Sequence, residues 1–410
     1  METLLLLQTA GGECPEDIAL LHGDECLERG LGYALPKVGA LRGYLNRFHE
    51  EEWELARPPR TVPKSSMMPS SEGVQGVQQF QAGLVGQLAQ RYEAQVQPLT
   101  VATVDEDATM IGSHKEAALA HYDGGQGYQP VVAVWADEFR DGNVPAQQSP
   151  LTCARWAFTA LPSTVKERYF RGDSACHKNE RLRGLNHPDR VQEPGGRMGF
   201  AVSAKLSEAL AAALAKVPES AWKTFGAEAD GTLRQWAEAD FVPGEAKEKK
   251  ARKPLRYVGL RLLKAQGVLF GDGSDRHDHA VITNQDWDGA RLWQWHREKA
   301  GTIEHVQEEI KNGLGGGHMP SQPFAANAAG FKLALISYHI ASAIQGLCFS
   351  PEERAARMKK YRLFIVHLAG RMSRFQCTLR LRFRASKAAI KRVFRVWEVF
   401  ELPTQATAFR

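Results

Sequence analysis

Residues 98–205 alternate between strand-like and helical segments, and this alternation constrains the fold more than any other feature of the sequence. The strand-like segments are rich in β-branched residues and end in turn residues. They occupy 98–107, two parts of 127–145, 164–174 and 197–205, and the helical segments occupy 150–162 and 177–185. The resulting order is strand, strand, strand, helix, strand, helix, strand. It predicts an α/β fold built on a mixed sheet.

This order of elements matches a ribonuclease H-like core, which we therefore expect. An Ala-rich helix and several β-rich runs with Gly–Asp turns interrupt the pattern at 206–290, and they predict a β-rich insertion subdomain. Helical spacing dominates before the core and again after residue 288. The expected organisation is a helical N-terminal region (1–95), the first part of the core (96–205), the insertion (206–290), the second part of the core (291–347) and a helical basic C-terminal region (348–410).

Positive charge is concentrated at the C-terminal end of the chain. The net charge is +5, from 52 Lys and Arg against 47 Asp and Glu, and residues 351–410 hold 15 of the former and 4 of the latter. That region therefore carries 15 − 4 = +11, and the remainder carries 5 − 11 = −6. A solvated helix face is one explanation. Because the basic residues recur over several elements, we favour contact with nucleic acid.

Cysteine usage and hydropathy indicate a cytoplasmic protein. The six cysteines are scattered and form no CxxC pair, which argues against a zinc site or a disulfide framework. The N-terminal leucines follow an acidic residue, unlike a signal peptide. Apolar runs stay shorter than the roughly 18–20 residues of a membrane span.

Acidic residues stand at the ends of two predicted strands. In VDEDAT, strand alternation places Asp105 and Asp107 on one face and Glu106 on the other. In YFRGDS, Asp173 follows a short apolar strand and a glycine. Solvated turn residues are the alternative explanation for each site taken alone. Together with a third acid, these carboxylates could bind divalent metal ions for phosphoryl transfer.

The third acid is predicted on a helix at 293–311. An apolar stripe with spacings of three and four residues defines its core-facing side, formed by Ile303, Val306, Ile310 and Leu314. At about 100° per residue, Glu304 lies at the margin of this stripe. Arg297 and Lys311 lie on the same line, seven residues before and after it. An exposed helix with mixed charges is the alternative.

Several of these motifs together resemble one family. VDEDAT, GYQPVVAVWAD, YFRGDSA and HREKAGTIEHVQEEIKNGLGGGHMP, followed by FAANAAGFKLALISYHI, are similar to a DDE transposase of the insertion-sequence 1380 group. The resemblance covers about residues 15–400. It implies a ribonuclease H-like catalytic core with a β-rich insertion, metal-dependent cutting at terminal inverted repeats, and joining of the ends to target DNA.

The resemblance assigns Asp107, Asp173 and Glu304 as the catalytic triad and as the ligands of two Mg²⁺ ions, with Mn²⁺ as a substitute. Lys311 matches the later basic residue of the family's Tyr–Arg–Glu–Lys signature, whereas Arg297 stands where that signature has Tyr. The partner is double-stranded DNA, bound by a homodimer. The residues expected to contact DNA are Arg297, Lys299, Lys311, Arg380, Arg382 and Arg384.

A second departure from the family lies at the N-terminus, and two rival functions remain beside the resemblance. Families of this kind carry a longer helical end-binding region, so residues 1–95 are expected to be a shortened one. Trp222, Trp236 and Trp287 lie in or beside the insertion; we interpret them as core residues, with base stacking as the alternative. The rival functions are a nuclease without strand transfer and a truncated or inactive DNA-binding derivative.

Overall fold

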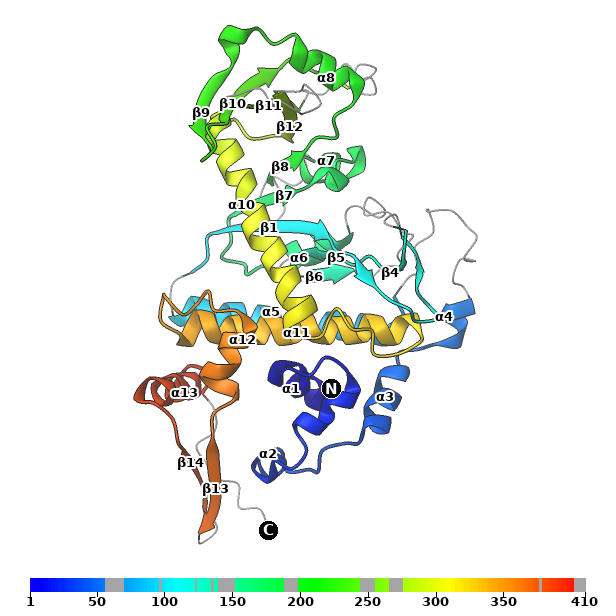
Figure 1. Cartoon of the computed structure of the whole chain (residues 1–410), viewed down its shortest axis with the longest axis vertical. Helices are drawn as coiled ribbons and strands as arrows, with labels where there is room; N and C mark the ends of the chain where they lie inside the picture. The colour runs from blue at the N-terminus through cyan, green and yellow to red at the C-terminus, as the bar shows by residue number, and fades with distance from the viewer. Residues whose placement is uncertain are drawn as a thin grey trace.

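A computed structural model of the chain describes residues 1–55, 70–95, 98–121, 124–133, 136–138, 152–187, 198–243, 255–264, 276–375 and 378–401. Figure 1 shows an elongated molecule. The insertion lies at one end, the core sheet and a layer of long helices lie in the middle, and the N-terminal helices and a C-terminal unit lie at the other end.

The core sheet has the topology predicted from the sequence. Its five strands are β1 (Val101–Ala108), β5 (Val131–Ala133), β6 (Ala136–Glu138), β7 (Glu167–Gly172) and β8 (Gly199–Ser203). In the sheet they follow the order β6-β5-β1-β7-β8. The three strands β1, β7 and β8 are parallel, whereas β5 and β6 are antiparallel to their neighbours. The helices α6 (Thr152–Thr159) and α7 (Asn179–Leu185) interleave with them. This arrangement confirms the ribonuclease H-like core.

The insertion is antiparallel, as expected, but it is continuous with the core sheet. It comprises α8 (Glu208–Ala215), η4 (Glu219–Ala221), β9 (Lys223–Ala227), β10 (Leu233–Ala239), β11 (Arg256–Leu263) and β12 (Arg276–Thr283). Strand β12 pairs with β8, so one nine-stranded sheet ends in β12-β11-β10-β9. Pairing with β12 satisfies the backbone of β8, which would otherwise be an open sheet edge.

The tryptophans of the insertion mainly serve the core, as the sequence indicated. Trp222 and Trp236 are each only 7% exposed. The guanidinium of Arg261 lies 4.4 Å from the ring centroid of Trp222. Trp287 is half-buried, and its ring centroid lies 5.4 Å from that of Tyr169.

A long helix, α10 (Gly289–Glu308), crosses the sheet and connects the insertion with the helical layer (Figure 1). It begins at Asp288, whose carboxylate accepts the backbone N–H groups of Ala290 and Arg291. It continues as η5 (Glu309–Gly313) and ends before Gly315, whose φ of 72° favours glycine. The predicted apolar stripe is buried, with Ile303, Val306, Ile310 and Leu314 at most 6% exposed.

The helical layer is formed by α5 (Glu72–Gln95) and α11 (Phe324–Cys348), which pack side by side. Helix α11 is long and apolar enough to cross a membrane, but 67% of its apolar window is buried inside the protein. It is therefore the central core helix. Three short strands beside the core form a separate small sheet: β2 (Ile111–Gly112), β3 (Leu119–Ala120) and β4 (Gln126–Tyr128).

Both terminal regions pack on α11. The N-terminal helices α1 and α3 contact it directly, and so does α13 near the C-terminus. The N-terminal elements are α1 (Glu2–Ala10), η1 (Pro15–Leu20), α2 (Glu25–Leu31), α3 (Val38–Asn46) and α4 (Glu51–Leu55). The C-terminal elements are α12 (Met358–Tyr361), η6 (Arg362–Val366), β13 (Gly370–Phe375), β14 (Thr378–Phe383) and α13 (Lys387–Val399). Strands β13 and β14 form a two-stranded ribbon that projects from the molecule (Figure 1).

Candidate active site

The two predicted aspartates lie at the carboxyl ends of neighbouring parallel strands, Asp107 near the end of β1 and Asp173 directly after β7. In the register of β1 and β7, Asp105 lies opposite Arg171 and Glu106 lies opposite Gly172. The next positions are Asp107 and Asp173, at the carboxyl end of each strand. Asp173 also begins the short helix η2 (Ser174–Cys176), where its carboxylate accepts the N–H of Ala175 at 3.0 Å.

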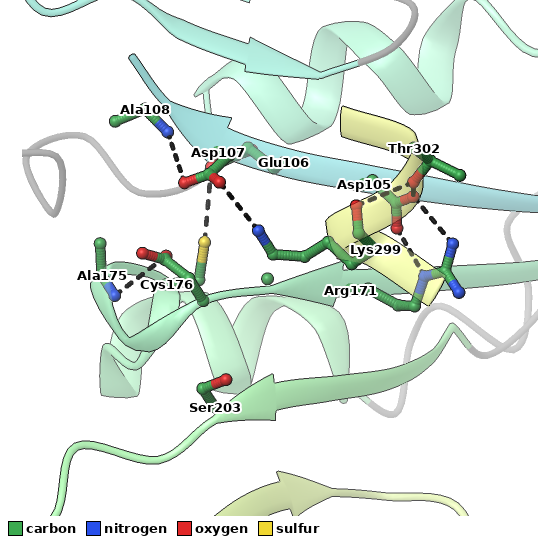
Figure 2. Close-up of polar contacts among 12 residues, drawn as sticks. Asp105, Glu106, Asp107, Ala108, Arg171, Ala175, Cys176, Ser203, Lys299 and Thr302 are labelled. Atoms are coloured by element: carbon green, nitrogen blue, oxygen red, sulfur yellow. Dashed lines mark hydrogen bonds and ion pairs between the residues drawn. The ribbon is translucent and has the colours of Figure 1, made fainter. Parts of the chain in front are cut away.

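Asp107 lies in a partly buried and electrostatically mixed environment. Burial raises the pKa of its carboxyl group, the cation of Lys299 lowers it, and the nearby Asp173 raises it again, with a net increase. Oδ1 accepts the N–H of Ala108 at 2.9 Å, and Oδ2 accepts a hydrogen bond from Nζ of Lys299 at 2.9 Å. Lys299 comes from α10, so this helix contacts the carboxylate directly (Figure 2).

A buried ion pair attaches α10 to the same face of the sheet. Nε and Nη2 of Arg171 donate to the two carboxylate oxygens of Asp105 at 2.6 and 2.8 Å. From α10, Thr302 donates its hydroxyl to Asp105, and Glu298 accepts from Nη1 of Arg171 at 3.0 Å. The guanidinium of Arg171 also lies 5.1 Å from the ring centroid of Trp295. These contacts fix α10 in position over β1 and β7.

The opposite face of β1 carries a second buried ion pair. Arg181 of α7 donates to the carboxylate of Glu106, and both side chains are at most 2% exposed. The thiol of Cys176 lies against both of them. Burial raises the pKa of this thiol, which keeps it protonated and unreactive. This pair supports the strand that bears Asp107.

His296 on α10 contacts the end of β7 just before Asp173. Its Nε2 lies 3.2 Å from the carbonyl oxygen of Gly172 and 3.4 Å from Oγ of Ser203. Burial lowers the pKa of the imidazole to about 4. The ring is therefore neutral at pH 7, and Nε2 donates its proton to the carbonyl of Gly172.

The other predicted site residues on the helix lie apart from the aspartate pair. Glu304 is exposed. Arg297 is 46% exposed and lies 4.0 Å from Glu228 of the insertion. Lys311 donates to Oγ1 of Thr109 at 3.2 Å and to the carbonyl of Met110 at 3.0 Å, which braces the segment after β1. Burial lowers the pKa of its ammonium group.

The basic residues predicted on the C-terminal ribbon lie far along the molecule from the aspartates (Figure 1). Arg382 and Arg384 are exposed on and just after β14. Arg380 belongs to β14, and its side chain lies outside the described part of the structure.

The sequence interpretation missed the attachment of α10 through Asp105, Arg171 and Thr302. A signal for it was present, because Arg171 precedes Asp173 by two residues just as Asp105 precedes Asp107. When two parallel strands place Asp107 beside Asp173, the residues two positions earlier, Asp105 and Arg171, also lie side by side. Lys299 was expected to contact DNA, and the structure engages it with Asp107.

Comparison with known families identifies the chain. The family model for the transposase DDE domain, group 1, matches residues 1–401. The chain belongs to the DDE transposases. Members of this family act on DNA and use divalent metal ions. No curated protein matches this transposase.

The aspartate pair has the chemistry that such a metal requires. Carboxylate oxygens are hard ligands for Mg²⁺ and Mn²⁺, and Asp107 and Asp173 are close enough to influence each other electrostatically. Within the described residues, no group of three His, Cys, Asp or Glu side chains gathers at one point. The described side chains therefore bring no third carboxylate to this pair.

Proposed function

We propose that this transposase belongs to the insertion-sequence 1380 group, cuts DNA at the terminal inverted repeats of an insertion sequence and joins the ends to target DNA. The observation that carries the proposal is the position of Asp107 and Asp173 at the carboxyl ends of β1 and β7, two adjacent parallel strands of a ribonuclease H-like sheet. The family match over residues 1–401 supports it.

Each acid has a proposed role. Asp107 and Asp173, together with Glu304, hold two Mg²⁺ ions, for which Mn²⁺ can substitute. When bound, these ions stabilise the charge that develops on the attacking and leaving oxygens of the phosphodiester. Glu304 is exposed on the helix that also carries Lys299 and Thr302. Glu304 lies about 140° around α10 from Lys299, so its proposed role requires a rearrangement of the site on substrate binding.

The proposed DNA contacts combine the helix and the C-terminal region. Arg297 and Lys299 flank the site on α10, and Lys311 follows on η5. The ribbon residues Arg382 and Arg384, together with Arg380, provide a second phosphate-binding surface at the other end of the molecule. Transposition requires paired ends, so we propose a homodimer on DNA.

The decisive experiment is cleavage of a duplex bearing the flanking inverted repeats, with Mg²⁺ or Mn²⁺. We expect Glu304→Gln and Asp107→Asn to lose at least about a thousandfold in rate, a size typical for removal of a group essential to charge stabilisation. Glu308→Gln is the matched control, because Glu308 is another exposed carboxylate on α10 and its partner is Arg357, outside the site. Retained cleavage by Glu304→Gln combined with loss by Glu298→Gln would reassign the third acid.

Strand-transfer assays separate the rival functions. Pre-cut ends and a target plasmid should give joined products with the wild type. Cleavage without joined products indicates a nuclease of the same fold. DNA binding without cleavage, equal in the wild type and Asp107→Asn, indicates an inactive DNA-binding derivative.

A further inference from the structure

The ammonium group of Lys299 donates to a carboxylate oxygen of Asp107, which is a proposed metal ligand. Its Nζ lies 2.9 Å from Oδ2 of Asp107, and the two side chains are only 10% and 19% exposed. The other oxygen of Asp107 already accepts the N–H of Ala108. A divalent ion on Asp107 would share this carboxylate with both donors. It would also bring two further positive charges close to an ammonium group in a poorly hydrated site.

We propose that Lys299 is an internal counter-ion that competes with the divalent metal for Asp107 and moves to a phosphate of the DNA when the metal binds. This inference rests on the proposed function. The lysine side chain suits the role, because a flexible four-carbon stem ends in a compact charge that can exchange partners. Asp173 adds to the negative charge that the ammonium group offsets before a metal binds.

The attachment of α10 does not depend on Lys299, which lets the side chain exchange partners while the helix stays in place. Arg171 and Thr302 hold the helix through Asp105 and the backbone carbonyl of Trp295. The ion pair between Arg171 and Asp105 is almost fully buried. Removal of the Lys299 charge is therefore expected to leave the fold intact.

Competition at Asp107 couples metal binding to DNA binding. Without DNA, metal binding separates Lys299 from its carboxylate and gives it no new partner. With DNA, a phosphate oxygen accepts the released ammonium group. Metal and DNA should therefore strengthen each other's binding, and the coupling must be reciprocal.

The test measures Mn²⁺ affinity of the full chain without DNA, by calorimetry and by electron paramagnetic resonance. Lys299→Met should bind Mn²⁺ at least about tenfold more tightly than the wild type, which equals about 1.4 kcal/mol. Lys299→Arg retains the charge and should stay near the wild type. Arg297→Met removes a positive charge from the same helix, where the guanidinium lies 4.0 Å from Glu228 and is 46% exposed, and should change the affinity by less than about twofold.

Wild-type affinity in Lys299→Met, or an equal gain in Arg297→Met, overturns the inference. Should Lys299→Met fail to fold, the wild type gives an independent measurement. Its Mn²⁺ affinity should rise at least about fivefold when a short duplex is bound. The signal from Asp107→Asn on the same duplex is subtracted as background. An unchanged affinity overturns the inference. Binding of Mn²⁺ by Asp107→Asn at wild-type strength instead refutes the metal site of the proposed function.

Discussion

Two aspartates on the same face of β1 have different surroundings and therefore different roles. Asp105 receives both arms of the Arg171 guanidinium, and its side chain is 4% exposed. Asp107 receives one ammonium group and is 19% exposed. A bidentate arginine pair is held rigidly, whereas a lysine pair exchanges partners more readily. Asp105 thus anchors α10, and Asp107 stays available to a ligand.

Removing one member of the buried pair should destabilise the protein strongly. Arg171→Met leaves the Asp105 carboxylate buried without its cation, so we expect the free energy of unfolding to fall by about 3–5 kcal/mol. Arg297→Met, on the exposed face of α10, should cost less than about 0.5 kcal/mol. Urea denaturation of both variants measures the difference. A loss in Arg171→Met as small as that in Arg297→Met would mean that the ion pair contributes nothing to stability.

His296 gives the stability a defined pH dependence. Its pKa is about 4 in the folded protein and about 6.5 in an unfolded chain, so between these values only the unfolded state binds the proton. Stability should therefore fall as the pH drops from 6.5 to 4, by about 3 kcal/mol from this group. In His296→Gln this component disappears. The measurement is chemical denaturation from pH 7 to 4, with the exposed His22→Gln as control.

At the scale of elements, the contact between α10 and the insertion depends on a glycine. A Cβ at Gly289 would lie 2.1 Å from Cε3 of Trp236 on β10. Gly289→Ala should therefore force repacking and cost about 1–3 kcal/mol. Gly301, also in α10, has no neighbouring atom within 4 Å of such a Cβ, so Gly301→Ala should stabilise the helix by about 0.5–1 kcal/mol. Thermal denaturation measures the change in stability of each variant. If both variants are stabilised, or both are destabilised, this packing is refuted.

The local elements could be predicted from the sequence because their signals are local. The strands β7 and β8 and the helices α6 and α7 fall within the segments expected for them, and β1 extends one residue beyond its segment. The pairing of β12 with β8 could not be predicted, because hydrogen bonding between distant strands leaves no local signal. Strand β13 was missed for a similar reason: its segment, GRMSRF, becomes a strand by pairing with β14.

In the candidate site, too, the features with a local sequence signal could be predicted and those set by distant residues could not. Strand-end position identified Asp107 and Asp173, and the structure aligns their strands in register. Helical spacing placed Glu304 at the margin of the buried stripe, and its side chain lies on the exposed side of that margin. The partners of Lys299 could not be inferred, because the rotation of α10 over the sheet is fixed by Arg171 and Asp105, which are distant in sequence.

At the scale of the whole molecule, the ribbon of β13 and β14 projects at the end opposite the insertion (Figure 1). In the ribbon, Arg371 lies directly opposite Arg382, and both are exposed. Like charges directly opposite each other across an antiparallel pair are destabilising. A polyanion bound along the ribbon would remove that repulsion, which supports the phosphate-binding surface proposed there.

The salt dependence of DNA binding tests this surface. Each phosphate contact contributes about 0.9 to the slope of log affinity against log salt, so replacing Arg380, Arg382 and Arg384 with glutamine should reduce the slope by about 2–3. Fluorescence anisotropy with a labelled duplex over a range of salt concentrations measures it.

The matched control removes three lysines from the insertion, Lys216, Lys223 and Lys264, all exposed. Both triple variants change the net charge by the same amount, so a general effect of charge would flatten both slopes equally. Only direct phosphate contact flattens the slope of the ribbon variant alone, because counterions are released where the protein meets the DNA backbone. A ribbon variant with the wild-type slope would exclude the ribbon from the DNA interface and leave the +11 charge of residues 351–410 to another partner.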